Sequence, residues 1–180
     1  MKKNLGFTLV ETLVAVAVLV LAVTGAFAAA QTGITSSTYS RDQVIAFYLA
    51  QEGVEFVRNI RDQNALQGQP WLTGLSSCLS QPQSGLLNVC TVDIPNNLTI
   101  FCNSDGDFGV CPLLQKSPTT SFYGYNFGGP SFDTIFRREI QITPINQHEV
   151  SVLVFMTWYR GGTARIFQAR ENLFDWQTNT

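Results

Sequence analysis

The sequence predicts an α+β protein in which one long N-terminal helix packs against a C-terminal antiparallel β-sheet. Residues 7–64 are expected to be helical, because an apolar stretch is followed by side chains with a helical period. Residues 131–180 alternate apolar and polar side chains, which is typical of strands. Between them, residues 65–130 are rich in Gly, Pro, Ser and Asn and hold all four cysteines, which indicates a loop-rich insert.

The first part of the helix, residues 7–30, has the length and composition of a membrane-spanning segment. Its 24 residues carry one charge, Glu11, and a helix of this length spans roughly 36 Å at about 1.5 Å per residue. A carboxylate inside such a helix costs about 2.5 to 3.5 kcal/mol on insertion scales. We therefore expect Glu11 to have a function and a partner.

Two simpler explanations of this segment leave Glu11 unexplained. A cleaved secretory signal would account for Lys2, Lys3 and the small residues 28–30, but the apolar core of such a signal is usually about 7 to 15 residues long and lacks acids. A plain single-span anchor would account for the length and for lysines left on the cytoplasmic side. Neither explanation gives the carboxylate a role.

The start of the chain resembles the processing motif of type IV pilins and pseudopilins. The residues that carry this resemblance are Lys2, Lys3, Gly6, Phe7, Thr8, Leu9, Val10 and Glu11. The resemblance implies that a prepilin peptidase/methyltransferase removes residues 1–6 as a leader by cutting after Gly6, and that Phe7 becomes the N-methylated first residue. It implies as further partners other pilin subunits, an inner-membrane assembly platform and, before assembly, membrane lipid.

The same resemblance assigns Phe7, Thr8 and Glu11 to assembly. Cleavage creates an α-amine at Phe7 that is largely cationic at neutral pH, and Glu11 of one subunit can meet the amine of a neighbour as helices stack. At about 4 Å and an effective dielectric constant near 20, the pair gains roughly 4 kcal/mol before desolvation is subtracted. Gly6 suits the cleavage site because a residue without Cβ lets a protease approach the backbone closely.

Residues 31–64 are expected to be the amphipathic second half of the same helix. Its apolar stripe consists of Ile45, Leu49, Phe56 and Ile60, with Gly53 in the gap. On the opposite side, the pairs Glu55 with Arg58 and Arg58 with Asp62 have the spacing of surface ion pairs worth a few tenths of a kcal/mol each. The complete helix would measure roughly 87 Å, so its first half is expected to project from the head.

The cysteines are expected to form disulfides in an exported head. Cys78, Cys90, Cys102 and Cys111 are spaced too widely for a Cys-x-x-Cys metal or redox motif. Four cysteines allow three pairings, which the sequence leaves open, and the pairing of Cys78 with Cys90 and of Cys102 with Cys111 is preferred. In many pilins the disulfide loop lies near the C-terminus, so the roles of that loop are not carried over to this chain.

One stretch of the insert offers possible calcium ligands. Asn103, Asp105 and Asp107 occupy alternate positions, a spacing that can direct oxygen atoms at Ca²⁺. An EF-hand loop, however, requires a glycine where Phe108 stands and a bidentate acid where Leu114 stands. A polar turn closed by a disulfide is the favoured interpretation, and we expect neither a bound metal nor a cofactor.

The last quarter of the chain is expected to form an antiparallel meander. The strands are FRREIQIT, ended by Pro144, then the central strand EVSVLVFMTWY, and finally TARIFQAR after a tight turn at Gly161 and Gly162. The pattern of Trp158, the glycine turn and the final stretch to Trp176 looks like the C-terminus of minor pilins of the pilus-modification type. The two resemblances cover the first 64 residues and about the last 40.

Charge and composition limit the possible functions. The formal charge is −2, and loss of the leader with its two lysines makes it −4, which argues against nonspecific nucleic-acid binding. Five arginines near the C-terminus are expected to be solvated strand residues: Arg137, Arg138, Arg160, Arg165 and Arg170. Catalysis has little support, because the single histidine, His148, lies in a turn-like segment and no nucleophile motif or paired acids are present.

We therefore expect a structural subunit, a minor pilin or pseudopilin, rather than an enzyme. It would sit in the cytoplasmic membrane as a single pass with its head outside, and then enter an extracellular pilus or a periplasmic pseudopilus of type II secretion. The alternative is a membrane-tethered binding module that never polymerises. The sequence alone does not separate the pilus from the secretion filament.

Overall fold

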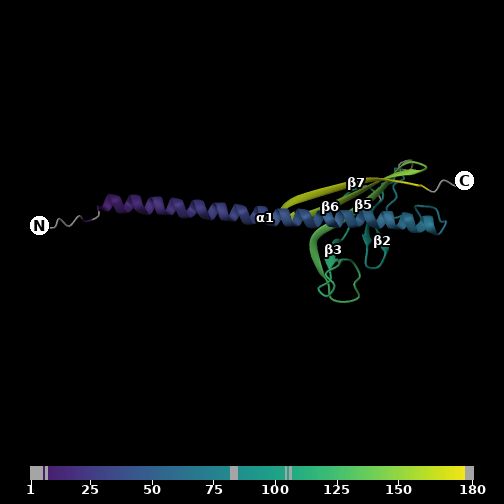
Figure 1. Cartoon of the computed structure of the whole chain (residues 1–180), viewed down its shortest axis with the longest axis horizontal. Helices are drawn as coiled ribbons and strands as arrows, with labels where there is room; N and C mark the ends of the chain where they lie inside the picture. The colour runs from purple at the N-terminus through teal and green to yellow at the C-terminus, as the bar shows by residue number, and fades with distance from the viewer. Residues whose placement is uncertain (1–5, 7, 82–84, 104, 106, 177–180) are drawn as a thin grey trace. The chain divides into compact units, whose positions relative to one another are not determined.

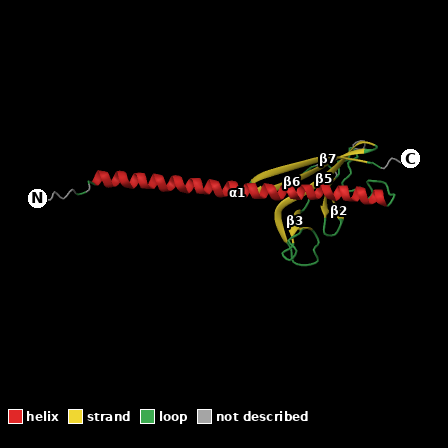
Figure 2. Cartoon of the chain, in the orientation of Figure 1, coloured by secondary structure: helices red, strands yellow, loops and turns green. Residues whose placement is uncertain are grey.

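The computed structural model describes residues 6, 8–81, 85–103, 105 and 107–176. One helix, α1 (Leu9–Leu66), is followed by seven strands. The strands are β1 (Val89–Asp93), β2 (Leu98–Asn103), β3 (Leu113–Lys116), β4 (Tyr123–Gly124), β5 (Phe132–Asn146), β6 (Glu149–Arg160) and β7 (Thr163–Phe174). Figure 1 traces them along the chain and Figure 2 separates helix from strands. The predicted α+β architecture, a long N-terminal apolar helix packed on an antiparallel sheet, is confirmed.

The chain divides into two compact units, residues 1–43 and residues 44–180. The helical part of the first unit is the stretch of α1 from Leu9 to Gln43. Several of its hydroxyl side chains bond within the helix, because they donate to a carbonyl three or four residues earlier; examples are Thr12 to Leu9 O at 2.8 Å and Thr24 to Val20 O at 2.8 Å. Such bonding reduces the polarity of this stretch of the helix surface.

The second unit contains one antiparallel sheet built around β5 and β6. Strand β6 pairs along its full length with β7 on one side and, up to Trp158, with β5 on the other, as predicted for a central strand. The other edge of β5 pairs with β1 at Ile140 and with β3 between Phe132 and Arg137. Strands β2 and β4 extend β1 and β3. The predicted turn is also confirmed, since Gly161 and Gly162 have positive φ values of 59° and 77°.

The C-terminal part of α1 covers one face of this sheet. Of the predicted stripe, Leu49 and Phe56 are buried, whereas Ile45 and Ile60 are only partly buried. The deepest contact is made by a neighbouring row of small residues, of which the prediction named only Gly53: Ala46, Ala50, Gly53 and Val57. Small side chains let the helix lie close to the strands, and this shifts the centre of the contact around the helix.

Two local predictions are wrong. Strand β5 does not end at Pro144, which pairs with Val150, and the strand continues to Asn146. Proline is tolerated there because the ladder changes register directly after it. Arg58 does pair with Glu55, but its second partner is Glu171 of β7, while Asp62 pairs with Arg61.

The region 65–130, expected as an insert beside the sheet, contributes β1, β2, β3 and β4 to the same sheet. In this region the segments VCTVD and LTIFCN form β1 and β2, which pair with each other. The segment that precedes β3 lies against the face of the sheet opposite α1, where Phe108 contacts Phe155 with ring centroids 3.8 Å apart. That face is therefore covered in part by the cysteine-bearing segment.

Candidate assembly site and buried charges of the head

The helix begins with a capping arrangement that includes Glu11. The Glu11 N–H donates to the Thr8 hydroxyl at 3.3 Å, and the Thr12 N–H donates to the Thr8 carbonyl at 3.1 Å. Thr8 is thus the N-cap, and Glu11 occupies the third helical position, where a capping box places an acid. The carboxylate also lies at the helix N-terminus, where the helix dipole favours negative charge.

The predicted processing residues lie just before this cap. Gly6 is exposed, and a Cβ built on it would have no atom within 4 Å. Phe7, the predicted first residue of the mature chain, lies outside the described residues. Within the part of the chain that the structure describes, Glu11 is exposed and forms no ion pair.

The surface of α1 after the cap is apolar and uncovered. From residue 9 to residue 37 every side chain is exposed, and the sequence has no charge between Glu11 and Arg41. The large apolar side chains exposed there are Leu9, Val10, Leu13, Val14, Val16, Val18, Leu19, Val20, Leu21, Val23, Phe27 and Ile34. By length and composition the helix can cross a membrane. Its side chains suit lipid or other apolar helices.

In the second unit, Arg138 is a buried structural residue, and the prediction that it is solvated is wrong. Its side chain is fully buried on the face of the sheet that α1 covers. The guanidinium donates to the Leu49 carbonyl at 3.1 Å, to the Glu52 carboxylate at 2.9 Å and to the Val92 carbonyl at 2.7 Å. One side chain thereby joins α1, β5 and β1.

The absence of a side chain at Gly53 makes room for this arginine. A Cβ at Gly53 would lie 3.2 Å from Cδ of Arg138 and 3.3 Å from Cδ1 of Ile140. The signal for burial of Arg138 was present in the sequence, because it is in phase with Phe136, Ile140 and Ile142 along β5. The prediction nevertheless placed Arg138 in solvent, because its side chain is charged.

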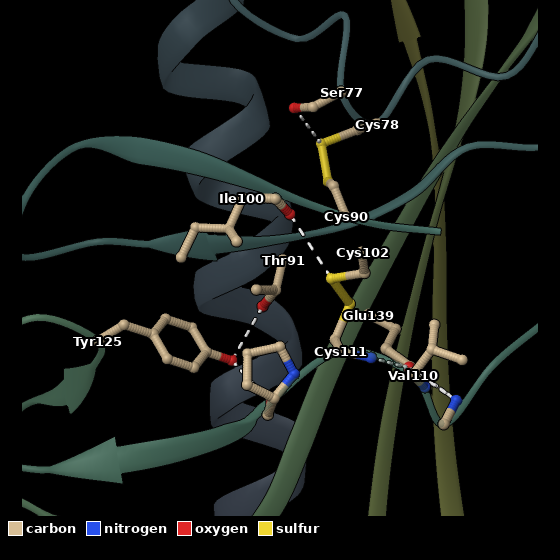
Figure 3. The surroundings of a disulfide bond; sticks show 12 residues. Ser77, Cys78, Cys90, Thr91, Ile100, Cys102, Val110, Cys111, Tyr125 and Glu139 are labelled. Carbon is tan, nitrogen blue, oxygen red and sulfur yellow. Dashed lines mark hydrogen bonds between the residues drawn. A yellow bond between two sulfur atoms is a disulfide. The ribbon is translucent and has the colours of Figure 1, made fainter. Parts of the chain in front are cut away.

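Glu139, the next residue, is buried on the opposite face and was not singled out from the sequence. Its carboxylate accepts backbone hydrogen bonds from Gly109 at 2.7 Å, Val110 at 2.8 Å and Cys111 at 3.1 Å. Figure 3 shows this carboxylate beside the disulfide that ends at Cys111. Charge-assisted hydrogen bonds of this kind are roughly twice as strong as neutral ones, so Glu139 anchors the segment to the sheet.

The structure pairs Cys78 with Cys90 and Cys102 with Cys111, which is the pairing preferred from the sequence. Cys78 and Cys90 are fully buried in the core, whereas Cys102 is partly buried. Of the possible calcium ligands, Asn103 accepts the Asp105 N–H at 3.0 Å through its side chain, as in a polar turn. Asp107 is exposed.

A buried tyrosine ties the cysteine-bearing segment to β1. The Tyr125 hydroxyl donates to the Pro112 carbonyl at 3.1 Å and lies 3.3 Å from the Thr91 hydroxyl (Figure 3). Burial raises the pKa of Tyr125, because the charged form would lose its hydration. The Tyr125 backbone N–H donates to the Asp93 carboxylate at 3.0 Å. These contacts have the character of structural bonds rather than of a catalytic centre.

The helix and the sheet together define an α+β, pilin-like architecture. Residues 1–27 match the family model described as the prokaryotic N-terminal methylation motif, which is the signal of type IV pilins and pseudopilins. The motif supports a type IV pilin-like prepilin, and proteins with this signal are structural subunits rather than enzymes. The motif and the apolar helix also fit membrane anchoring. Comparisons with curated proteins and with solved structures found no match for the chain.

Proposed function

We propose that this protein is a structural subunit, a minor pilin or pseudopilin, of a type IV pilus or a type II secretion filament. The observation that carries the proposal is the methylation motif at residues 1–27, which includes the start of an uncovered, apolar helix. The peptidase cuts after Gly6, and Phe7 becomes the N-methylated first residue of the mature chain. The C-terminal pattern that ends at Trp176 supports the minor-pilin assignment.

The domain organisation follows from this role. Residues 1–6 are the leader, residues 7–30 hold the subunit in the membrane and later pack the filament core, and residues 31–64 connect this segment to the head. Residues 65–130 and 131–180 form the head outside the cytoplasmic membrane. Two disulfides suit an oxidising compartment.

Glu11 is proposed to pair with the Phe7 amine of a neighbouring subunit. The pair gains roughly 4 kcal/mol at about 4 Å and an effective dielectric constant near 20, before the desolvation of both charges. The capping position of Glu11 offers a competing role, since an acid at this position stabilises a helix start without any neighbour. The two roles differ in whether the charge itself is required for assembly.

N-terminal peptide analysis and intact mass, measured on membrane and sheared surface fractions from the native cell, test this proposal. We expect a chain that begins at N-methylated Phe7, and its presence in the sheared fraction favours a surface pilus. A chain beginning at Met1 would overturn the proposal and leave the alternative, a membrane-tethered binding module. A start near Gln31 would mean that a signal peptide had been removed and the head secreted.

A further inference from the structure

The last strand, β7, leaves one long edge of the sheet unpaired. Within the described part of the chain, β6 is the only strand that pairs with β7. The β6–β7 ladder has no register shift, and the 12 residues of β7 include neither proline nor glycine. The other outermost strands are much shorter, since β2 has 6 residues and β4 has 2. Proteins usually prevent unwanted pairing at an edge with prolines, bulges or very short strands, and β7 has none of these.

The backbone groups of β7 that point away from β6 follow from the register. The two-residue turn between the strands makes Arg160 and Thr163 a hydrogen-bonded pair, and such pairs recur at every second residue. The bond from the Asp175 N–H to the His148 carbonyl at 2.8 Å keeps the same phase. The outward N–H and C=O groups therefore belong to six residues whose side chains are all exposed: Ala164, Ile166, Gln168, Arg170, Asn172 and Phe174.

An aromatic surface lies beside this edge on the side of the sheet that α1 covers. The Phe47 ring of α1 meets the Phe167 ring of β7 edge-on, with centroids 5.7 Å apart, and Phe47 remains 41% exposed. A strand added beyond β7 would place every second side chain on this side, next to Phe167. Glu171 points to the same side and is already paired with Arg58. This side of an added strand is therefore suited to apolar side chains.

The other side of the same edge is polar and positively charged. Gln168 and Arg170 are exposed there, and Arg170 forms no ion pair with the described residues. Opposite charges on neighbouring strands stabilise a sheet, whereas like charges destabilise it. An acid opposite Arg170 is therefore favoured. A second copy of β7 would instead bring its own Arg165 and Arg170, so pairing of two copies through this edge is disfavoured.

We infer that the outer edge of β7 binds an extended segment of a different protein as an additional strand. That segment has apolar residues at every second position, facing Phe47 and Phe167, and an acid opposite Arg170. In this mode of recognition, main-chain hydrogen bonds supply the affinity and the alternate side chains supply the specificity. The inference goes beyond the proposed function, because the edge lies in the head and can be tested whether or not the chain enters a filament.

A synthetic peptide tests the inference on the full chain in detergent micelles. In this probe valine alternates with threonine, and one central threonine is replaced by glutamate. We expect saturable binding by fluorescence anisotropy, together with amide hydrogen exchange slowed at least about tenfold at Ile166, Gln168 and Arg170. The amides of Arg165 and Phe167 already face β6 and are the internal control. A peptide that does not bind, or protection that does not alternate along β7, would overturn the inference.

A substitution at Gln168 tests the role of the backbone. Gln168→Pro removes one outward N–H, which an edge strand tolerates because β6 does not use this group. It should weaken peptide binding at least about tenfold, whereas Gln168→Ala keeps the N–H and should bind as the unchanged chain does. Thermal unfolding of both variants shows whether the fold is kept. Equal binding by two folded variants would contradict strand addition.

The charge and the identity of the partner have separate tests. Arg170→Glu should weaken binding about threefold, and a peptide with lysine in place of its glutamate should restore it. In the native cell, a photocrosslinking amino acid at Gln168 should join a segment of another protein with the pattern described above. Ile166→Pro should abolish that product and Ile166→Ala should keep it. A product with a second copy of this chain, or one that survives Ile166→Pro, would overturn the inference.

Discussion

Residues 9–37 of the first unit expose every side chain, most of them apolar, whereas the second unit buries charged side chains under its own sheet and helix. In the first unit, threonine hydroxyls bond back to carbonyls of the same helix. In the second, the Arg138 guanidinium and the Glu139 carboxylate form hydrogen bonds on opposite faces of β5. The apolar side chains of the first unit are thus suited to contact lipid or other chains, whereas the buried charged side chains of the second unit have partners within that unit.

This contrast explains why the two regions should respond differently to mutation. A change in residues 9–37 leaves the interior of the head untouched and acts on membrane insertion or assembly. A change at a buried charge of the head instead removes hydrogen bonds that hold the helix and loop segments to the sheet. Assembly and unfolding are therefore the measurements that separate the two regions.

The largest effect is expected from Glu11→Val. Processing and membrane insertion should remain intact, because valine suits an apolar helix, but incorporation into filaments should be lost with the pair worth roughly 4 kcal/mol before desolvation. The measurement compares the mature protein in membrane and sheared fractions. Normal incorporation of the variant would rule out the ion pair.

Glu11→Gln is the matched control for the capping role. Glutamine can still accept a hydrogen bond at the third helical position but has no charge. Failure of both variants would assign assembly to the charge. Normal assembly of the glutamine variant would show that Glu11 only caps the helix.

In the head, Arg138→Ala is expected to lower the free energy of unfolding by about 2 to 4 kcal/mol, because two carbonyls in the interior lose their donor, whereas the partly exposed Glu52 carboxylate can bind water instead. Thermal unfolding of the full chain in detergent, followed by circular dichroism, measures the loss. Arg170→Ala, at an exposed position on β7, is the control and should change stability by less than about 0.5 kcal/mol. Similar losses in both variants would contradict the anchoring role.

The two disulfides should differ in what their removal costs. Both close short loops, so each contributes about 3 kcal/mol by restricting the unfolded chain. Replacing Cys78 and Cys90 with alanine should cost more, because it also leaves a cavity in the core. The Cys102 and Cys111 double variant should lose less, since Glu139 still holds the segment. Denaturant unfolding of both variants tests the order, and a greater loss at Cys102 and Cys111 would reverse it.

The smallest effect is expected at Tyr125. Its pKa is raised by burial, so the neutral phenol stabilises the fold fully below the ordinary pKa of tyrosine, near 10, and that stability is lost as the pH rises from there through the higher folded pKa. Tyr125→Phe should cost about 1 kcal/mol at neutral pH through the lost hydrogen bond to Pro112. It should also flatten the dependence of unfolding on alkaline pH. An unchanged alkaline slope would assign that dependence to other groups.

Much of the fold was readable from local patterns. The apolar helix, the central strand β6 and the turn at Gly161 and Gly162 follow from side-chain periodicity and from the backbone freedom of glycine, which act over a few neighbouring residues. The processing motif is likewise contiguous in sequence. Each of these features is encoded by residues that lie next to one another in the chain.

Other features depended on residues far apart in sequence. The burial of Arg138 required Glu52 and Val92, which lie 86 and 46 residues away, together with space at Gly53. The role of Glu139 required the N–H groups of residues 109–111 to turn toward it. The sequence by itself determined the elements and the N-terminal motif, because these arise from local periodicity. Only the tertiary structure decided which charges are buried and which strand lies at the edge of the sheet, because both depend on partners that folding brings together.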